Sequence, residues 1–500
     1  MKMKISYVVV QAGGRGSRLQ EYTENKPKAI VSVNNLPIIY HLFRKFPEKK
    51  FIIIGDYRRD VLEKYLDTFP EVEHIVVDAE GKKGTCGGIS KALTIIPHGE
   101  PFILIWSDLI LGRDYELPVE EGNYVGLSGT FSCRWMYDGK DFIEKKSEEK
   151  GVAGFFIFKD KRELEGVPSS GEFVKWLSQT NHDFKTTVLS STAEYGLVEK
   201  IEKPKSGRCR PFNTMKVENG RLIKIGIDEQ GRKLAVREKA WYKHVSGMDV
   251  AIPKIYSYEP LVLELVSGKN VYEYSFSERE KSETLKRIMK SLKELHSFDI
   301  CEPDRFSMKE AYFDKTVSRL EKVRNLIPFS NDPVIEVNGK KCRNIFFHLD
   351  ELRCHIAELP CDHFCLIHGD CTFSNIILRD GITPVFIDPR GYFGKSEIVG
   401  DPNYDWAKLF YSVVGDYDQF NLGRFKLSIE RDKVKLSIET NGWRGMEKIF
   451  KEELPENVSM KDIRFIHALI WLSLTTYAWN DYDSVCGAFY NGLYYLEDSL

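Results

Sequence analysis

The sequence predicts two domains of different fold class: an α/β domain, followed by an α+β domain with a small β lobe and a larger helical lobe. Three observations support this prediction. The first 110 residues alternate strand and helix patterns, as parallel sheets with helices on both faces do. Residues 201–212 (IEKPKSGRCRPF) are charged and contain two prolines and a glycine, which suits a linker. Beyond them, hairpin-like strands give way to a mostly helical pattern.

The elements of the first domain follow from hydrophobic patterns. Ile5–Val10 is apolar except for Ser6, as expected of a strand buried on both faces. Residues 115–200 add strands and one helix, Gly171–Gln179. We therefore expect an α/β domain in residues 1–203, with a Rossmann-like mixed sheet and helices on both faces. Its other predicted strands are Phe51–Gly55, His74–Val77 and Phe102–Trp106, and its other helices are Pro37–Phe46, Asp60–Phe69 and Gly88–Ile96.

The second domain is predicted at residues 212–500, after a linker at 204–211. Asn219-Gly220 lies between two β-type segments and is a strong hairpin signal. Residues 212–268 are expected to form a β lobe that includes a helix at Lys233–Val245 and strands at Ile252–Tyr258 and Pro260–Leu265. Ser277 is a suitable N-cap, and residues 269–500 are predicted to be a helical lobe. This order of lobes is the bilobal, protein-kinase-like architecture.

Bulk composition limits the classes of function. A formal net charge of −2 gives no global field that would attract nucleic acid, so no nucleic-acid partner is expected. Ten scattered cysteines indicate reduced thiols rather than disulfides or structural zinc. The N-terminus lacks a signal-peptide pattern, and the longest apolar run, residues 466–481, is too short and too polar to span a membrane. We expect a cytoplasmic protein with no membrane span; its oligomeric state is not predicted.

One motif near the end of the chain contains the residues that phosphoryl transfer requires. Asp370 and Asn375 lie five residues apart, in the run HGDCTFSN, and Asp388 follows the next apolar strand. One carboxylate can accept the proton of an acceptor hydroxyl, while the amide and the second carboxylate hold magnesium against the phosphates of ATP. The order and spacing of these residues make a chance match improbable.

This segment resembles the aminoglycoside phosphotransferase and choline kinase family, over about residues 212–500. The resemblance implies that Asp370 is the catalytic base, that Asn375 and Asp388 bind Mg²⁺, and that His368 supports the loop. It further implies that Lys224 binds the phosphates of ATP and pairs with Glu238, and that the stretch from Glu264 to Val266 binds adenine through its backbone. Arg221 and Lys233 remain rivals for the role of Lys224.

The residues after Asp388 depart from the protein-kinase pattern. Pro389-Arg390-Gly391 stands where protein kinases have Phe-Gly, and no phosphorylatable activation loop follows, so a small acceptor is favoured over a protein. Arg390 offers a fixed fork of donors and could bind a substrate phosphate or carboxylate. An equally good interpretation is that it pairs with Asp401 or Asp405.

A second phosphate-binding pattern lies near the start of the chain. Gly13, Gly14 and Gly16 let backbone N–H groups approach a triphosphate closely. Arg18 and Lys28 place positive charge where negative charge builds as pyrophosphate leaves. A dinucleotide-binding loop is the rival interpretation, but the Arg-Leu and Lys-Pro-Lys that follow the glycines are not part of that motif.

This region, about residues 5–200, resembles the sugar-1-phosphate nucleotidyltransferases and the related phosphocholine cytidylyltransferases. The resemblance implies that Asp108 binds Mg²⁺, with a buried capping carboxylate as the alternative. The loop containing Gly84, Thr85 and Gly87 would lie near the base and sugar, and it favours a sugar or polyol phosphate. Glu172 would contact the sugar. Glu194 would be the second metal ligand, although the family has Asp there and a surface charge is an equal alternative.

The two predicted sites form a reaction sequence. With ATP, one half would phosphorylate a small hydroxyl metabolite; with a second NTP, the other half would convert the phosphate into an NDP-sugar or NDP-polyol for surface polysaccharide synthesis. The first alternative is a choline or amino-alcohol kinase joined to a CTP:phosphocholine cytidylyltransferase. It would bind a cationic headgroup on aromatic residues of the C-terminal lobe (Trp406, Tyr411, Trp471, Tyr477, Trp479). The second alternative is that one half is a non-catalytic regulatory module.

Overall fold

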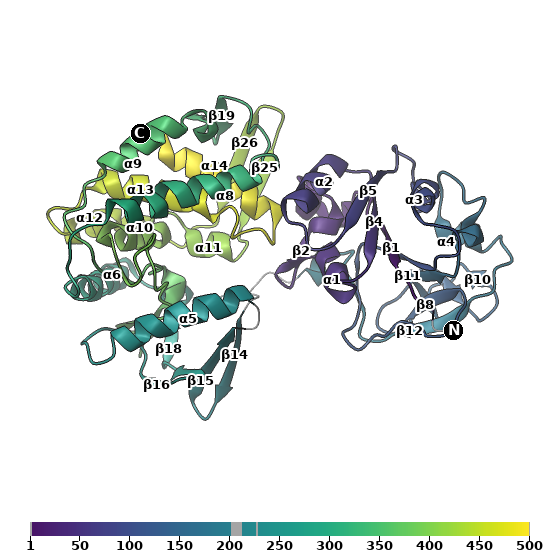
Figure 1. Cartoon of the computed structure of the whole chain (residues 1–500), viewed down its shortest axis with the longest axis horizontal. Coiled ribbons are helices and arrows are strands. Elements are labelled where there is room, and N and C mark those ends of the chain that lie inside the picture. Colours follow the sequence, from purple (N-terminus) through teal and green to yellow (C-terminus); the bar gives the residue numbers. More distant parts are fainter. Residues whose placement is uncertain (1–2, 202–212, 227–228, 500) are drawn as a thin grey trace. The chain divides into compact units, whose positions relative to one another are not determined.

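The chain forms two compact units. The computed structural model describes residues 3–201, 213–226 and 229–499 (Figure 1). The first unit comprises Met1–Glu202 and Trp479–Asp483, and the second comprises Lys203–Ala478 and Ser484–Leu500. The sequence predicts residues 479–483 in the second domain, but they belong to the first unit. There, Asp481 accepts a hydrogen bond from the buried Lys26 ammonium at 2.8 Å. The predicted linker, residues 204–211, lies outside the described residues.

The first unit is built on the mixed sheet that the sequence predicts. Its strands run in the order β10-β9-β11-β6-β1-β4-β5, with β8 on β11 and β12 on β8. Strand β1 pairs in parallel with β4 and β6, whereas β11 pairs antiparallel with β6. The strands are β1 (Tyr7–Gln11), β4 (Lys50–Gly55), β5 (His74–Asp78), β6 (Phe102–Trp106), β8 (Tyr124–Ser128), β9 (Met136–Tyr137), β10 (Phe142–Ile143), β11 (Gly151–Phe158) and β12 (Lys185–Leu189).

Helices cover both faces of this sheet, as the alternation of buried side chains requires. Helices α3 (Ile89–Ile95) and α4 (Phe173–Leu177) share one buried cluster with Ile52 and Leu104. On the other face, the ring of Phe43 in α1 (Ile38–Lys45) lies 4.7 Å from that of Phe51. The predicted helix at Asp60–Phe69 is α2 (Arg59–Thr68). Two short ribbons complete the unit: β2 (Ser32–Val33) with β3 (Leu36–Pro37), and β7 (Leu109–Ile110) with β13 (Ala193–Glu194).

The parallel register places the predicted site at one edge of the sheet. Tyr7 is level with Lys50 and Phe102, so β1, β4 and β6 end together. The glycine turn follows β1, and Asp108 lies two residues after β6. Ligands of such sheets bind outside the carboxyl ends of the strands. The two phosphate-handling elements of this half therefore meet at the same edge.

The second unit begins with the predicted β lobe. Strands β14 (Asn213–Glu218) and β15 (Arg221–Gly226) form a hairpin whose turn residues, Asn219 and Gly220, both have positive φ (49° and 69°). That conformation is the one a two-residue hairpin turn needs. The sheet continues through β17 (Leu261–Glu264) to β16 (Ile255–Tyr258), and α5 (Glu229–His244) follows β15.

The larger lobe of the second unit is mainly helical. Its first helix, α6 (Glu278–Leu295), begins with a capping box in which Ser277 and Glu280 each accept from the other's backbone N–H. The remaining helices are α7 (Arg305–Lys309), α8 (Lys315–Val323), α9 (Leu349–Glu358), α10 (Pro402–Val413), α11 (Tyr417–Asn421), α12 (Glu447–Glu453), α13 (Met460–Leu474) and α14 (Tyr482–Leu496). Small sheets between them join β18 (Gly268–Asn270), β22 (Ile376–Arg379) and β23 (Thr383–Phe386), and β21 (Cys365–Leu366) with β24 (Val399–Gly400).

The helical lobe also contains a four-stranded sheet that the sequence did not predict. A sheet in the order β20-β19-β26-β25 joins β19 (Val334–Val337) and β20 (Lys340–Arg343) to β25 (Phe425–Ile429) and β26 (Lys433–Ile438). Asn338 and Gly339 close its first hairpin with positive φ. This is the same Asn-Gly signal that revealed the hairpin of the β lobe.

The apolar run at 466–481 lies mostly in a buried helix, as expected. Helix α13 covers residues 460–474 and is buried over most of its length. Trp406, Tyr411 and Trp471 pack in the same core, each no more than 1% exposed. Within the described residues, no helix is both long and apolar enough to cross a membrane.

Candidate functional site

In the second unit, a two-stranded ribbon brings the motif residues together. Strands β22 and β23 pair antiparallel, Ile376 opposite Phe386, so Asn375 and Asp388 lie at the same end. The Asn375 side-chain amide donates to the Asp370 carbonyl at 2.8 Å. This bond uses the amide nitrogen and leaves the oxygen of Asn375 available as a metal ligand. The three residues that the motif predicts are thus neighbours in space.

Buried Asp405 holds the Asp370 loop in shape. Its carboxylate accepts hydrogen bonds from the backbone N–H groups of His368 (2.8 Å) and Gly369 (2.7 Å), and from the His296 ring (3.1 Å). Burial alone would raise the pKa of Asp405, but these donors and the nearby imidazoles lower it below its usual value. The His368 ring donates to the Ile387 carbonyl at 3.0 Å. His368 is therefore a support for the loop.

The predicted base has a partner that the sequence did not reveal. The Lys408 ammonium in α10 lies 2.9 Å from the Asp370 carboxylate. Burial works against the charge of Lys408, but Asp370 outweighs it and raises the pKa of the lysine. A lone lysine within the apolar run WAKLFYSV was the available signal, but nothing in the sequence linked it to Asp370.

Lys224 occupies the position expected of a phosphate-binding lysine. Its ammonium lies 2.8 Å from the Glu238 carboxylate and 2.7 Å from that of Asp388. Burial opposes the charge, but the two carboxylates raise the pKa of Lys224 well above its usual value. The two rivals are engaged elsewhere: Arg221 stacks on Tyr256, with its guanidinium carbon 4.2 Å from the ring centre, and Lys233 pairs with Glu229.

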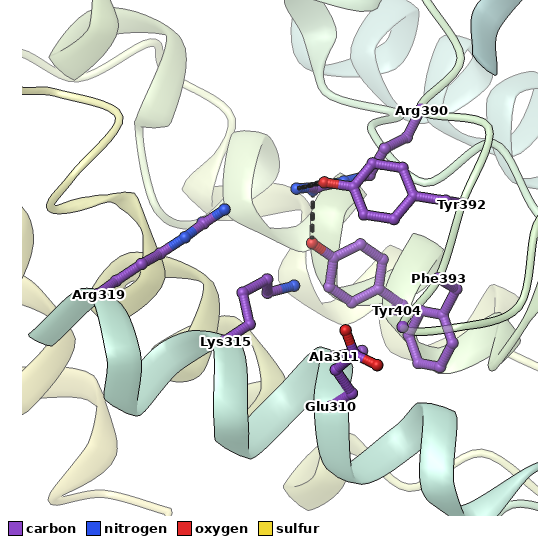
Figure 2. Close-up of a pocket in the computed structure, with 9 residues that line it drawn as sticks. Glu310, Ala311, Lys315, Arg319, Arg390, Tyr392, Phe393 and Tyr404 are labelled. Carbon is purple, nitrogen blue, oxygen red and sulfur yellow. Dashed lines mark hydrogen bonds between the residues drawn. The ribbon is translucent and has the colours of Figure 1, made fainter. Parts of the chain in front are cut away.

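The two other residues predicted in this unit have clear partners. The Glu264 carboxylate accepts from Arg379, and its backbone N–H already donates to the Lys254 carbonyl. Arg390 pairs with neither Asp401 nor Asp405. Instead its guanidinium donates to the phenols of Tyr404 (3.0 Å) and Tyr392 (3.1 Å), as Figure 2 shows. Arg390 thus faces a pocket rather than a structural ion pair.

In the first unit, the glycine turn packs closely against the segment that carries Lys28. Gly16 has φ +66°, and a Cβ there would lie 3.1 Å from the Lys28 Cβ. The Gly13 carbonyl accepts from the Tyr57 N–H at 3.3 Å. A Cβ on Gly14 would meet nothing within 4 Å, so this part of the turn faces open space. The turn thus packs against the Lys28 side chain and is open at Gly14.

The predicted cation and metal ligand of this unit pair directly. The Lys28 ammonium contacts the Asp108 carboxylate, and their side chains are 12% and 14% exposed. The Asp108 carbonyl accepts from the Tyr195 N–H at 2.9 Å, which brings Glu194 next to Asp108 along the ribbon. The Glu194 carboxylate, however, binds Lys200 at 2.8 Å. Arg18 packs beside Gly196, on the same side of the site.

The loop of Gly84, Thr85 and Gly87 folds onto the segment around Glu172. The Thr85 hydroxyl accepts from the Phe173 N–H at 2.8 Å, and a Cβ on Gly84 would lie 2.3 Å from the Gly171 carbonyl oxygen. The loop and the segment around Glu172 together form one wall of the site. Two residues that the sequence did not single out also contact this wall. The Gln11 amide donates to the carbonyls of Thr85 and Gly87, and Arg134 binds Glu172 at 2.5 Å.

The oxygen donors in both units suit magnesium better than a softer metal. Asn375 and Asp388 offer an amide and a carboxylate oxygen, and Asp108 offers a carboxylate. Mg²⁺ is commonly held by one or two carboxylates together with substrate phosphates and water. No group of three or more His, Cys, Asp or Glu side chains among the described residues could hold a metal ion by itself.

The two sites define the chain as a transferase that handles phosphate groups in two places. Residues 7–133 match the model of the nucleotidyl transferase family, and residues 227–426 match that of the phosphotransferase enzyme family. The chain therefore joins a nucleotidyltransferase domain to a kinase-like phosphotransferase domain.

Relatives and solved structures resemble one unit each. The chain is 29% identical over 174 residues to the mannose-1-phosphate guanylyltransferase catalytic subunit beta of Drosophila melanogaster, covering 30% of this chain and 47% of that protein. It is 32% identical over 111 residues to the UTP–glucose-1-phosphate uridylyltransferase AglF of Haloferax volcanii, covering 21% and 44%. The chain thus spans less than half of either relative. A structure of a gentamicin–APH(2")-IIa complex is 18% identical with a TM-score of 0.37, covering 56% of this chain and 87% of that one.

Proposed function

We propose that the chain is a bifunctional activating enzyme. Its second unit phosphorylates a small hydroxyl metabolite with ATP, and its first unit transfers a nucleotidyl group from a second NTP to that phosphate. The products are pyrophosphate and an NDP-sugar or NDP-polyol, the kind of building block used in surface polysaccharides. The observation that carries this proposal is that each unit pairs a buried or partly buried lysine with a carboxylate suited to magnesium, Lys224 with Asp388 and Lys28 with Asp108.

In the kinase step, Asp370 accepts the proton of the acceptor hydroxyl as its oxygen attacks the γ-phosphorus. Lys408 positions the Asp370 carboxylate, and Lys224 binds the phosphates of ATP while Glu238 fixes its ammonium. Magnesium held by Asn375 and Asp388 would neutralise charge on the phosphates. Glu264 and the residues after it would contact adenine.

In the nucleotidyl step, the phosphate of the acceptor attacks the α-phosphorus of the NTP. The N–H groups of the turn at Gly13, Gly14 and Gly16 hold the triphosphate. Arg18 and Lys28 stabilise the charge that builds on pyrophosphate. Magnesium on Asp108 would be joined by Glu194 only if Glu194 leaves Lys200. The loop of Gly84, Thr85 and Gly87, with Glu172, would form the wall for base and sugar.

The nature of the acceptor is supported by two observations. Both curated relatives described above are named for a sugar 1-phosphate, and they differ in their nucleotide, so a sugar-like phosphate is better supported than any one base. Of the five rings that the choline alternative would use, Trp406, Tyr411 and Trp471 belong to the core, whereas Tyr477 and Trp479 are partly exposed. The described cysteines are free, which fits the reducing conditions of a cytoplasm.

The proposal is tested with the full-length protein, magnesium, each of the four NTPs, and a panel of sugar, polyol and choline phosphates. We expect pyrophosphate release with one NTP and a sugar or polyol phosphate. Pyrophosphate release with phosphocholine alone would establish the alternative. If every pairing fails while ATP is still consumed with an alcohol, the first unit is the non-catalytic module.

A further inference from the structure

A small polar pocket opens in the second unit beside the kinase motif. It encloses about 160 Å³ between helix α8, the turn before it, and the segment after Asp388. Figure 2 shows Lys315 and Arg319 leaving the same helix toward Arg390. The turn before α8, Glu310–Asp314, is π-helical, a local widening of helices that often marks functional sites. The space suits a small metabolite rather than an oligosaccharide.

The lining of this pocket is strongly cationic. It carries three cations, Lys315, Arg319 and Arg390, against one carboxylate, Glu310. Glu310 lies on the far side of Lys315 from Arg319 (Figure 2), and its carboxylate is 3.6 Å from the Lys395 ammonium. The lining therefore has a net positive charge that its own carboxylate does not cancel.

The bonds that the three cations make do not neutralise them. Arg390 donates to two phenols, and Arg319 donates to the carbonyl and hydroxyl of Ser473, each at 2.8 Å. Among the described residues, Lys315 makes no hydrogen bond or ion pair, and its ammonium lies 5.3 Å from the centre of the Tyr404 ring. Gathering like charges in a sheltered site costs free energy unless an anion joins them.

The ionisation of the surrounding groups reflects this positive potential. Burial, and then the charges of Arg390 and Arg319, lower the pKa of Lys315 well below its usual value. Burial would raise the pKa of the Tyr392 phenol, yet Arg390 outweighs it and lowers that pKa to about 8. A bound anion would reverse both effects.

The pocket lies near the proposed catalytic base. The Lys408 ammonium, which pairs with Asp370, lies 6.0 Å from the centre of the same Tyr404 ring that faces Lys315. The backbone N–H of Arg390 donates to the carbonyl of His368, two residues before Asp370, at 2.8 Å. A small molecule in the pocket would thus place a hydroxyl near Asp370.

We propose that the kinase acceptor is itself an anion: a hydroxy compound whose phosphate group binds Lys315, Arg319 and Arg390. The inference rests on the proposed kinase function. Two planar guanidinium forks and an ammonium match the several oxygens of a phosphate, and a carboxylate would share the same chemistry with fewer contacts. The acceptor oxygen forms a bond to the γ-phosphorus, its proton passes to Asp370, and the bond from that phosphorus to the bridging oxygen breaks as ADP leaves. The product carries one phosphate more than the acceptor.

The test measures ADP release by the full chain with matched acceptors: a free sugar or polyol, its monophosphate, and its carboxylic acid. We expect the phosphorylated acceptor to give the highest kcat/KM. Arg319→Met and Lys315→Met should each raise KM for this acceptor about tenfold or more, while KM for ATP stays unchanged. Arg319→Lys should retain more of the affinity than Arg319→Met. Lys322→Met, which removes an exposed lysine from the same helix, is the matched control.

A neutral acceptor that is used as well as its phosphate, with KM insensitive to Arg319→Met, would overturn the inference. If no acceptor consumes ATP, the proposed kinase function fails, and the anion site is then tested separately by thermal shift with inorganic phosphate. A shift that weakens in Lys315→Met and Arg319→Met, but not in Lys322→Met, supports the anion site, and equal shifts in all four proteins refute it.

Discussion

The two units use the same pair of charges in different ways. In each, a lysine proposed to bind phosphate contacts a carboxylate proposed to bind magnesium: Lys28 with Asp108, and Lys224 with Asp388. In the second unit Glu238 also holds the lysine, at 2.8 Å. Among the described residues, Lys28 pairs with Asp108 alone. In the proposed mechanism, metal binding at Asp108 would separate the first pair, whereas Lys224 would keep Glu238 as an anchor when metal binds Asp388.

This difference indicates how the units prepare for their substrates. Lys224 is held in place before ATP arrives, because Glu238 does not compete with a metal. Lys28 would become available in this mechanism only when magnesium and NTP draw Asp108 away. On this proposal the second site is preorganised and the first is completed by its ligands, and mutations in either unit can test this difference.

The largest expected effect comes from removing the two lysines. Lys28→Met should lower pyrophosphate release by about 10²–10³, because the charge that builds on pyrophosphate loses its partner. Lys224→Met should lower ADP release by a similar factor, also about 10²–10³. Each variant should leave the reaction of the other unit unchanged, as measured by separate assays of the full chain. The control is Lys233→Met, an exposed lysine of α5; if either variant affects both reactions, the two sites are not separate.

A smaller effect is expected from the anchor that only the second unit has. In Glu238→Gln, the Lys224 ammonium can still pair with the Asp388 carboxylate until magnesium binds Asp388. After that, no carboxylate among the described residues fixes the position of the ammonium. We expect KM for ATP to rise about tenfold, the effect of losing about 1.4 kcal/mol of binding. The measurement is ADP release against ATP concentration at saturating magnesium. An unchanged KM would mean that Glu238 is a structural partner only.

The close approach of two loops gives a prediction specific to the first unit. Gly84 has φ +87°, and a Cβ there would clash with the Gly171 carbonyl oxygen. Gly84→Ala should displace the wall that carries Glu172, because its Cβ would clash with the Gly171 carbonyl, and raise KM for the phosphate acceptor about threefold to tenfold. ADP release should not change. Gly81→Ala, in the same unit but with open space beside its Cβ, is the matched control. The prediction fails if both glycine variants behave alike.

Which residues belong to each candidate site could largely be predicted from the sequence, because short motifs carry both sites. The spacing of Asp370, Asn375 and Asp388 predicted their proximity, and the hairpin at Asn219-Gly220 placed Lys224 on the correct strand. The mixed sheet of the first unit, with helices on both faces, was predicted from its strand–helix alternation. These features depend on local sequence and on turn chemistry, which a single chain displays.

The residues that the sequence did not reveal are joined to the sites by tertiary packing. Lys408 lies 38 positions after Asp370, and Lys315 and Arg319 lie about 50 positions before it. In the sequence KTVSRLEKV these cations are indistinguishable from the solvated face of an amphipathic helix. Gln11 and Arg134 are isolated polar residues whose partners belong to distant loops. Only the fold shows which charges face a pocket.

The smallest effects concern stability, where the units should respond to pH with opposite sign. In the second unit, burial raises the pKa of Asp401 to about 6. Its contribution to the free energy of unfolding is therefore fully present below about pH 3.8 and is lost as pH rises through 6. In the first unit, the hydrogen bond from Arg162 lowers the pKa of Asp160 to about 2, despite burial. Its contribution is present above pH 3.8 and is lost as pH falls through 2.

Hydrogen exchange of the full chain between pH 2 and 7 can follow each unit separately. Asp401→Asn should remove a slope on the order of 1 kcal/mol per pH unit between pH 4 and 6 for amides of the second unit. Asp160→Asn should remove a slope only below about pH 3.8, and only for amides of the first unit. A slope that survives both substitutions would have to come from other groups.

A one-pot assay can measure whether one chain performs both proposed steps in sequence. The full-length protein receives labelled acceptor, ATP, magnesium and the active NTP. We predict that wild type forms the NDP-linked product, that Asp108→Asn accumulates the newly phosphorylated acceptor, and that Asp370→Asn forms product only when that phosphorylated compound is supplied. Product formed from the original acceptor by Asp370→Asn at the wild-type rate would contradict the account.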